Sequence, residues 1–133
     1  MAGSAWKVET SVTLPAEPAA AARARSVLER TLAQAGVEES RRFEALLVTS
    51  ELVANAVTHG SRLGDEISLD VSLEGTLLRI AVRDAARGRT IPQAFTRDEE
   101  RPTGRGLAVV DWLADWSERI VDGRREVRAA LKL

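Results

Sequence analysis

Every second side chain is apolar or threonine from Trp6 to Leu14, and Pro15 ends this pattern. A period of two is typical of a strand that buries one face and exposes the other. The start of the chain is therefore predicted to form a strand.

Two later segments are predicted to form hairpins. Residues 67–73 and 78–82 alternate in the same way, and the residues between them, Glu74-Gly75-Thr76, are suited to a turn. The segment from Trp116 to Val121 is followed by an Asp-Gly turn and then by residues 127–133, which alternate again.

Apolar residues recur every three or four positions in three other segments, which predicts helices. The first covers about residues 17–35, the second runs from about Glu38 to His59, and the third begins near Gly106. Glycines at the ends of the first two helices fit caps. The second helix is expected to bury a stripe of five apolar residues: Phe43, Leu46, Leu47, Val53 and Val57.

The order of these elements predicts one domain over residues 1–133, of the α+β class. Hairpin connections favour a mostly antiparallel sheet, here of about five strands. The three helices would cover one face of this sheet in a two-layer sandwich. Neither an internal repeat nor a domain linker interrupts the pattern.

Composition excludes several classes of site. The 133 residues include no cysteine and one histidine, which rules out disulfides, thiolate metal sites and a histidine metal cluster. A net charge of −1 argues against a broad face for direct nucleic-acid binding. The chain shows neither a signal peptide nor an apolar run that spans a membrane, so we expect a cytoplasmic protein without membrane contact.

Candidate chemistry begins on the second helix, where Glu51, Asn55 and His59 follow each other at four-residue spacing. At 100° per residue these side chains lie beside the apolar stripe, on the border between core and solvent. A carboxylate and an amide at such a border are costly unless they are hydrated, paired or bound to a ligand. The plain alternative is an exposed helix edge, with His59 a last-turn residue favoured by the helix terminus.

Asp84 has the same parity as Leu78, Ile80 and Val82, so its carboxylate is predicted to point inward at the end of a strand. A turn-forming aspartate is the alternative interpretation. Residues 85–103 follow without any sustained period, and a loop of this length is often functional or disordered.

Gly104 and Gly106 stand where the chain enters the third helix. Free N–H groups at a helix N-terminus favour a phosphate, although glycine there often reflects loop geometry alone. Arg105 is either a phosphate contact or a solvated side chain. Together with the acid, the amide and the strand-end carboxylate, these residues supply what a Mg–nucleotide site requires.

Three motifs resemble those of the GHKL, or Bergerat, ATP-binding domains, and in particular their bacterial anti-sigma-factor and serine-kinase branch. ELVANAVTHG at 51–60 looks like the N box, VRDAARG at 82–88 like the G1 box, and GRGL at 104–107 like the G2 box. The likeness spans the whole chain and implies the Bergerat fold.

The resemblance implies a role for each matching residue. Glu51 would be the catalytic base, Asn55 the Mg²⁺ ligand and Asp84 the acid that recognises adenine. Residues 85–103 would be the ATP lid. The remaining positions implied to contact nucleotide are Gly88, Gly104, Arg105, Gly106 and Leu107.

One position departs from the family pattern, which commonly reads Asp-x-Gly-x-Gly in the G1 box. Ala86 replaces the first of these glycines. Its methyl group is expected to crowd the approach of adenine or to hold the backbone away from positive φ.

The leading hypothesis is an ATP- and Mg²⁺-dependent serine/threonine protein kinase that regulates transcription as an anti-sigma factor. The resemblance implies two partners, a sigma factor and an anti-anti-sigma protein of the STAS type that is phosphorylated, and it allows a homodimer. Two alternatives remain: a partner-sequestering module with weak or structural nucleotide binding, and a simple ATPase. Trp112 and Trp116, four residues apart, are expected to pack in the core, with partner contact as the alternative.

Overall fold

The computed structural model describes residues 7–87 and 105–133. These residues form five strands and three helices in the order predicted from the sequence. The elements are β1 (Lys7–Pro15), α1 (Ala20–Gln34), α2 (Glu39–His59), β2 (Glu66–Glu74), β3 (Leu77–Asp84), α3 (Arg105–Leu113), β4 (Asp115–Val121) and β5 (Arg124–Lys132).

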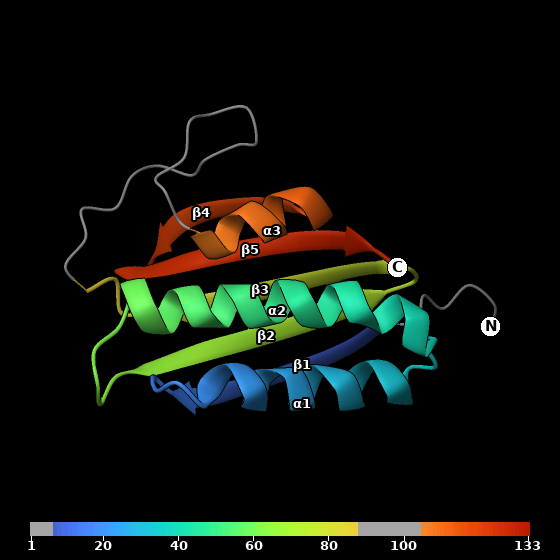
Figure 1. Ribbon diagram of the computed structural model, residues 1–133, viewed down its shortest axis with the longest axis horizontal. Helices are drawn as coiled ribbons and strands as arrows, with labels where there is room; N and C mark the ends of the chain where they lie inside the picture. Colours follow the sequence, from blue (N-terminus) through green and yellow to red (C-terminus); the bar gives the residue numbers. More distant parts are fainter. Residues whose placement is uncertain (1–6, 88–104) are drawn as a thin grey trace.

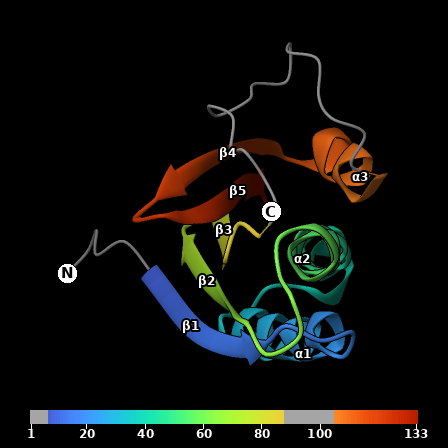
Figure 2. The same cartoon turned by 90° about the vertical axis from the view of Figure 1, so that its left-hand side faces the viewer.

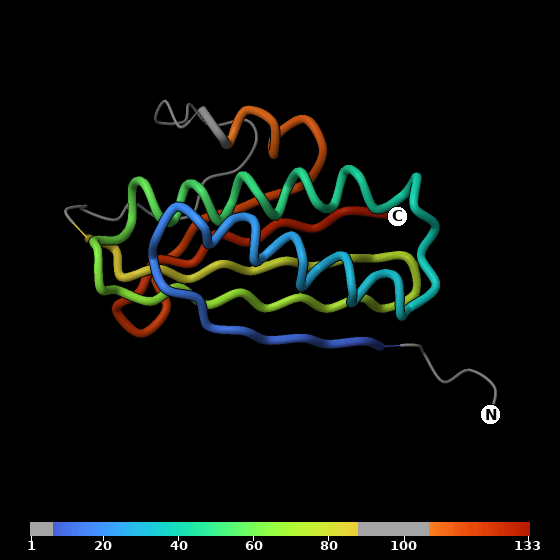
Figure 3. Tube along the Cα trace, turned by 60° about the horizontal axis from the view of Figure 1, so that its bottom comes forward, coloured from blue at the N-terminus to red at the C-terminus, as the bar shows by residue number. Residues whose placement is uncertain are grey.

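The strands pair in the order β1-β2-β3-β5-β4, and each neighbouring pair is antiparallel. All three helices lie against one face of this sheet, while its other face is left open (Figures 1 and 2). Figure 3 shows α1 and α2 side by side, both running roughly along the direction of the strands. The predicted α+β two-layer sandwich is confirmed.

The connection between β4 and β5 is the tight turn predicted from its Asp-Gly sequence. Asp122 and Gly123 both have positive φ, 52° and 77°. This geometry matches the right-handed twist of the flanking strands, so it favours a two-residue hairpin loop.

α2 is central in the helix layer, where it contacts α1, α3 and the sheet. Its buried apolar residues are Ala45, Val48, Leu52, Val53 and Ala56. The predicted stripe was therefore partly wrong, because Phe43 is 67% exposed. Phe43 stands nine residues before Leu52, which rotates it about 180° from the buried side of the helix.

The two tryptophans do not form a pair on one helix. Trp116 is buried on β4, as expected for a core residue, whereas Trp112 near the end of α3 is 86% exposed. The core prediction for Trp112 was wrong, because α3 ends at Leu113 and turns only its other side toward the core.

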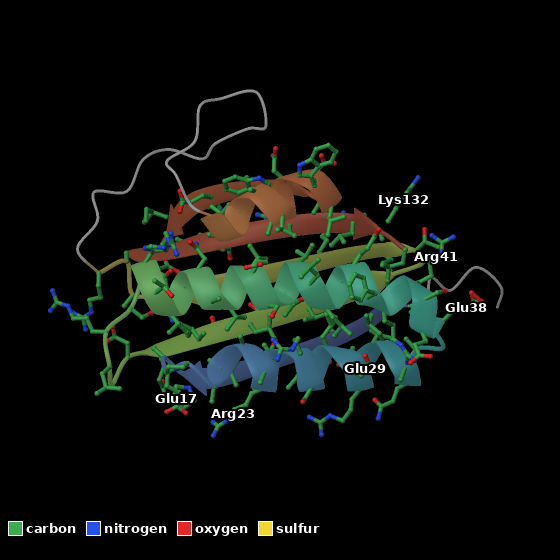
Figure 4. The ribbon with its side chains drawn as sticks, viewed as in Figure 1. Glu17, Arg23, Glu29, Glu38, Arg41 and Lys132 are labelled. Atoms are coloured by element: carbon green, nitrogen blue, oxygen red, sulfur yellow. The ribbon has the colours of Figure 1, made fainter. Side chains whose placement is uncertain are left out.

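Charged side chains occupy the outer surface of the helix layer. Glu17 and Arg23 form an exposed ion pair of 3.8 Å and lie at the outer edge of α1 in Figure 4.

In the described part of the chain, none of the helices combines the length and the apolar character needed to cross a membrane.

Candidate functional site

The second half of α2 carries the acid and the amide predicted from the sequence. Asn55 is buried, Glu51 is half-buried one turn earlier, and His59 is exposed. Within the described residues, the Nδ2 atom of Asn55 is buried without a hydrogen-bond partner. A buried amide without a partner is costly, so this side chain is suited to hold a ligand.

Asp84 ends β3 and lies against Gly60, the residue that caps the C-terminus of α2. A β-carbon built at Gly60 would fall 2.6 Å from Oδ1 of Asp84 and closer still to Oδ2. At a rise of 1.5 Å per residue, Asn55 lies about 7 Å along α2 from this junction and Glu51 about 6 Å farther. Glu51 and Asn55 therefore lie on one edge of α2, about 40° apart around the helix, and Asp84 lies at the end of the same helix.

The carboxylate of Asp84 is not free. Arg125, its cross-strand neighbour on β5, donates from Nε to Oδ2 at 2.8 Å, and its Nη2 lies 2.6 Å from the same oxygen. The backbone N–H of Ala86 donates to Oδ1 at 2.8 Å. Arg125 also donates from Nη1 to Oε1 of Glu118 on β4, at 2.9 Å.

Asp84, Arg125 and Glu118 thus form a buried network, each at most 3% exposed. Two carboxylates face one guanidinium, which leaves the group one negative charge in excess if all three are ionised. Sequence reasoning missed Arg125 and Glu118. Their parity was the available signal, because Arg125 alternates in phase with Val127 and Glu118 with Trp116, both of which point inward.

Ala86 follows Asp84 with φ of 59°, a left-handed conformation that glycine adopts more easily. The expectation that its methyl group holds the backbone away from positive φ was therefore wrong. The contact with Asp84 Oδ1 offsets the strain of this conformation.

Arg87 fixes the chain immediately before residue 88. Its backbone N–H donates to the carbonyl of Gly60 at 3.1 Å, and its guanidinium holds both carboxylate oxygens of Asp65, at 2.8 and 3.0 Å. The hydrogen bond from Arg87, followed by one from the backbone of Arg62, lowers the pKa of Asp65 to about 2. The same partner raises the pKa of Arg87.

The glycine motif is only partly described. Gly88, Gly104 and most of the predicted ATP lid lie outside the described residues. Arg105 and Gly106 belong to the first turn of α3, as predicted, while their side chains are not described. Leu107 is buried and belongs to the hydrophobic core.

Comparison with known sequences decides the family. Residues 14–131 match the histidine kinase-like ATPase domain. The chain belongs to this family. No curated protein matches the sequence significantly.

Among solved structures, this histidine kinase-like ATPase domain is similar to a crystal structure of the RsbU and RsbW domains of Rv1364c from Mycobacterium tuberculosis. The TM-score is 0.70 and the sequence identity 24%, over 94% of this chain and 32% of the other. The chain thus spans about a third of that protein's resolved length, and the similarity shows a common fold.

The buried amide of α2 fits a Mg²⁺ ion that would accompany ATP, the nucleotide that the family implies. Mg²⁺ is usually held by one or two protein oxygens together with phosphate oxygens, and the buried carboxamide of Asn55 has the chemistry to provide one. A half-turn of the amide group exchanges its oxygen and nitrogen, so the unpartnered position of this side chain is one that its oxygen would fill beside a metal.

The open face of the sheet carries a second group of charges, away from the helices of this histidine kinase-like ATPase domain. Glu126 on β5 accepts from Nε of Arg83 at 2.7 Å and from Nε of Arg119 at 2.8 Å. Burial alone would raise the pKa of Glu126, but the hydrogen bonds from Arg119 and Arg83 outweigh it and hold that pKa below its usual range. These residues line a shallow concavity of about 620 Å³, and none of them belongs to the predicted ATP site.

Proposed function

We propose that the protein is an ATP-binding regulator of the anti-sigma type that phosphorylates a serine or threonine of a STAS-domain partner. The observation that carries this proposal is the arrangement along α2. A half-buried carboxylate and a buried, unpartnered carboxamide lie on one edge of a helix whose end packs on Asp84. Family membership and the motif resemblance support it.

Each residue has a chemical task in this proposal. Bound Mg–ATP supplies the γ-phosphoryl group, and Asn55 holds the metal through its amide oxygen. Glu51 accepts the proton of the partner's hydroxyl as that oxygen bonds to the γ-phosphorus and ADP leaves. Within the described residues, the Glu51 carboxylate has no ion-pair or hydrogen-bond partner that would have to be displaced first.

One observation favours a second function. Asp84 is held by Arg125 and Ala86, and a domain whose adenine acid is engaged suits a module that sequesters a sigma factor or STAS partner with little help from nucleotide. The Glu51 geometry is also compatible with transfer of phosphate to water, as in a simple ATPase.

Calorimetric titration of the full chain with Mg–ATP tests the proposal. We expect binding below about millimolar nucleotide, weakened when Asn55→Ala removes the metal ligand. Wild-type protein that releases no heat of binding at that concentration contradicts both the kinase and the ATPase, and the sequestering module remains. Transfer of labelled phosphate to a purified STAS-domain protein, rather than to water, then separates kinase from ATPase.

A further inference from the structure

Asp84 is enclosed on three sides by parts of its own protein. Arg125 occupies Oδ2, the backbone N–H of Ala86 donates to Oδ1, and Gly60, the C-cap of α2, packs on the carboxylate. Asp84 and Arg125 are each 1% exposed. An amino group arriving from a ligand would meet a carboxylate whose hydrogen-bonding positions are largely filled.

We infer that Arg125 sets the nucleotide affinity and base selectivity of this site. Its guanidinium takes the position on Asp84 that the amino group of adenine would otherwise fill. The inference rests on the proposed function, since it concerns the same nucleotide site. While Arg125 is bound to Asp84, the nucleotide is held only through packing of its base and contacts to its phosphates. The site then does not distinguish a purine that carries a 6-amino group from one that does not.

A second carboxylate, that of Glu118, keeps Arg125 in contact with Asp84. Glu118 accepts from Nη1 at 2.9 Å, so a rotation of the guanidinium away from Asp84 would break contacts to both carboxylates. Removing one partner of a buried ion pair leaves an uncompensated charge, which is strongly unfavourable. Adenine therefore does not displace Arg125 without a large loss of affinity.

A double variant frees the carboxylate of Asp84 from Arg125 without changing the net charge of the buried network. Glu118→Gln with Arg125→Thr removes one charge of each sign, leaving Asp84 with the single negative charge that the network already has in excess. The matched control, Glu126→Gln with Arg119→Thr, removes a buried carboxylate and its arginine from the same two strands on the opposite face. Circular dichroism and urea unfolding establish that each variant is folded.

Titration with Mg–ATP and with Mg–inosine triphosphate provides the measurement. The donor amino group at position 6 of adenine is an acceptor oxo group in inosine, which a carboxylate at that position would repel, and N1 changes with it from acceptor to donor. A hydrogen bond to a charged group corresponds to roughly a 10- to 100-fold difference in affinity. We expect wild type and control to bind both nucleotides equally, and the double variant to prefer ATP by about that factor. General loosening of the pocket would change both affinities together and leave their ratio at one.

Several outcomes overturn the inference while nucleotide binding stands. One is a wild-type preference for ATP of about tenfold or more, which needs no variant to observe; another is a folded double variant that binds both nucleotides equally. If neither wild type nor variant binds nucleotide, the inference and the kinase proposal fail together. If only the double variant binds ATP, the inference holds and the wild-type protein is the sequestering module.

Discussion

Gly60 and Asp84 lie in direct contact, so the end of α2 and the end of β3 are packed without room for a side chain between them. The φ of Gly60 is −116°, which any residue adopts, so glycine is required here by close approach rather than by backbone conformation. Because Arg125 holds Asp84 from the other side, the carboxylate is not free to move away. This contact joins the helix that carries Glu51 to the strand that carries the acid.

Gly60→Ala is expected to destabilise the protein by about 1–3 kcal/mol, because the added methyl group must displace Asp84 or the end of α2. Urea unfolding measures the change. Gly64→Ala measures the separate cost of a positive φ, since a β-carbon there meets nothing within 4 Å and only its φ of 96° is unfavourable. A Gly60→Ala variant as stable as wild type would show that the contact with Asp84 is not restrictive.

Asp84 was predictable from the sequence, and Arg125 was recognisable only in part. The period of two along β3 fixes the side of the sheet to which Asp84 points. The partner across the strand pair lies 41 residues farther along, and its register depends on how β3 and β5 meet in the folded protein. Parity alone would have shown only that Arg125 points inward, and it does not show which acid Arg125 contacts.

The helix patterns show the same limit. Element type followed from periodicity, and the three predicted helices are present in the described residues. Which side of α2 is buried depends on the positions of α1 and α3, and so Phe43 was placed in the core although it is exposed. The candidate site residues Glu51 and Asn55 were singled out because their chemistry is unusual at a core border, and the structure places one half-buried and the other buried.

Glu51→Gln is expected to preserve Mg–ATP affinity and to lower phosphotransfer by roughly 10²- to 10⁴-fold, the usual range for loss of a general base. The amide keeps the shape of the side chain but does not accept a proton at neutral pH. Single-turnover transfer from labelled ATP separates the two effects. Glu44→Gln is the control, because Glu44 lies two turns earlier on the same side of α2 and is exposed. Equal transfer by wild type and Glu51→Gln would remove Glu51 from the base role.

Ala86→Gly is expected to raise the free energy of unfolding by up to about 1 kcal/mol, because glycine adopts the φ of 59° without the strain of a β-carbon. ATP affinity is expected to change little, since the backbone of Ala86 already has the left-handed conformation and Arg125 still holds Asp84. Thermal unfolding and calorimetry on the same samples test both statements. A rise in ATP affinity of tenfold or more would instead identify the methyl group as the obstacle.

The ion pair between Asp65 and Arg87 predicts a specific acid sensitivity. The folded pKa of Asp65 is about 2, below its ordinary value of 3.8, with the hydrogen bond from Arg87 as the main cause. A lowered folded pKa contributes stability above the unfolded pKa, and this contribution disappears as the pH falls from about 4 to about 2. The raised pKa of Arg87 has no effect in that range, because Arg87 stays protonated.

We therefore expect wild-type protein to lose more stability between pH 4.5 and pH 2.5 than Asp65→Asn, in which no carboxylate titrates at this position. Urea unfolding across this range gives the two slopes, and their difference isolates Asp65 from the other acids of the chain. Asp70→Asn, on the open face of β2, is the control for replacing an aspartate elsewhere in the sheet. If Asp65→Asn and wild type lose stability in parallel, the ion pair between Asp65 and Arg87 does not form in solution.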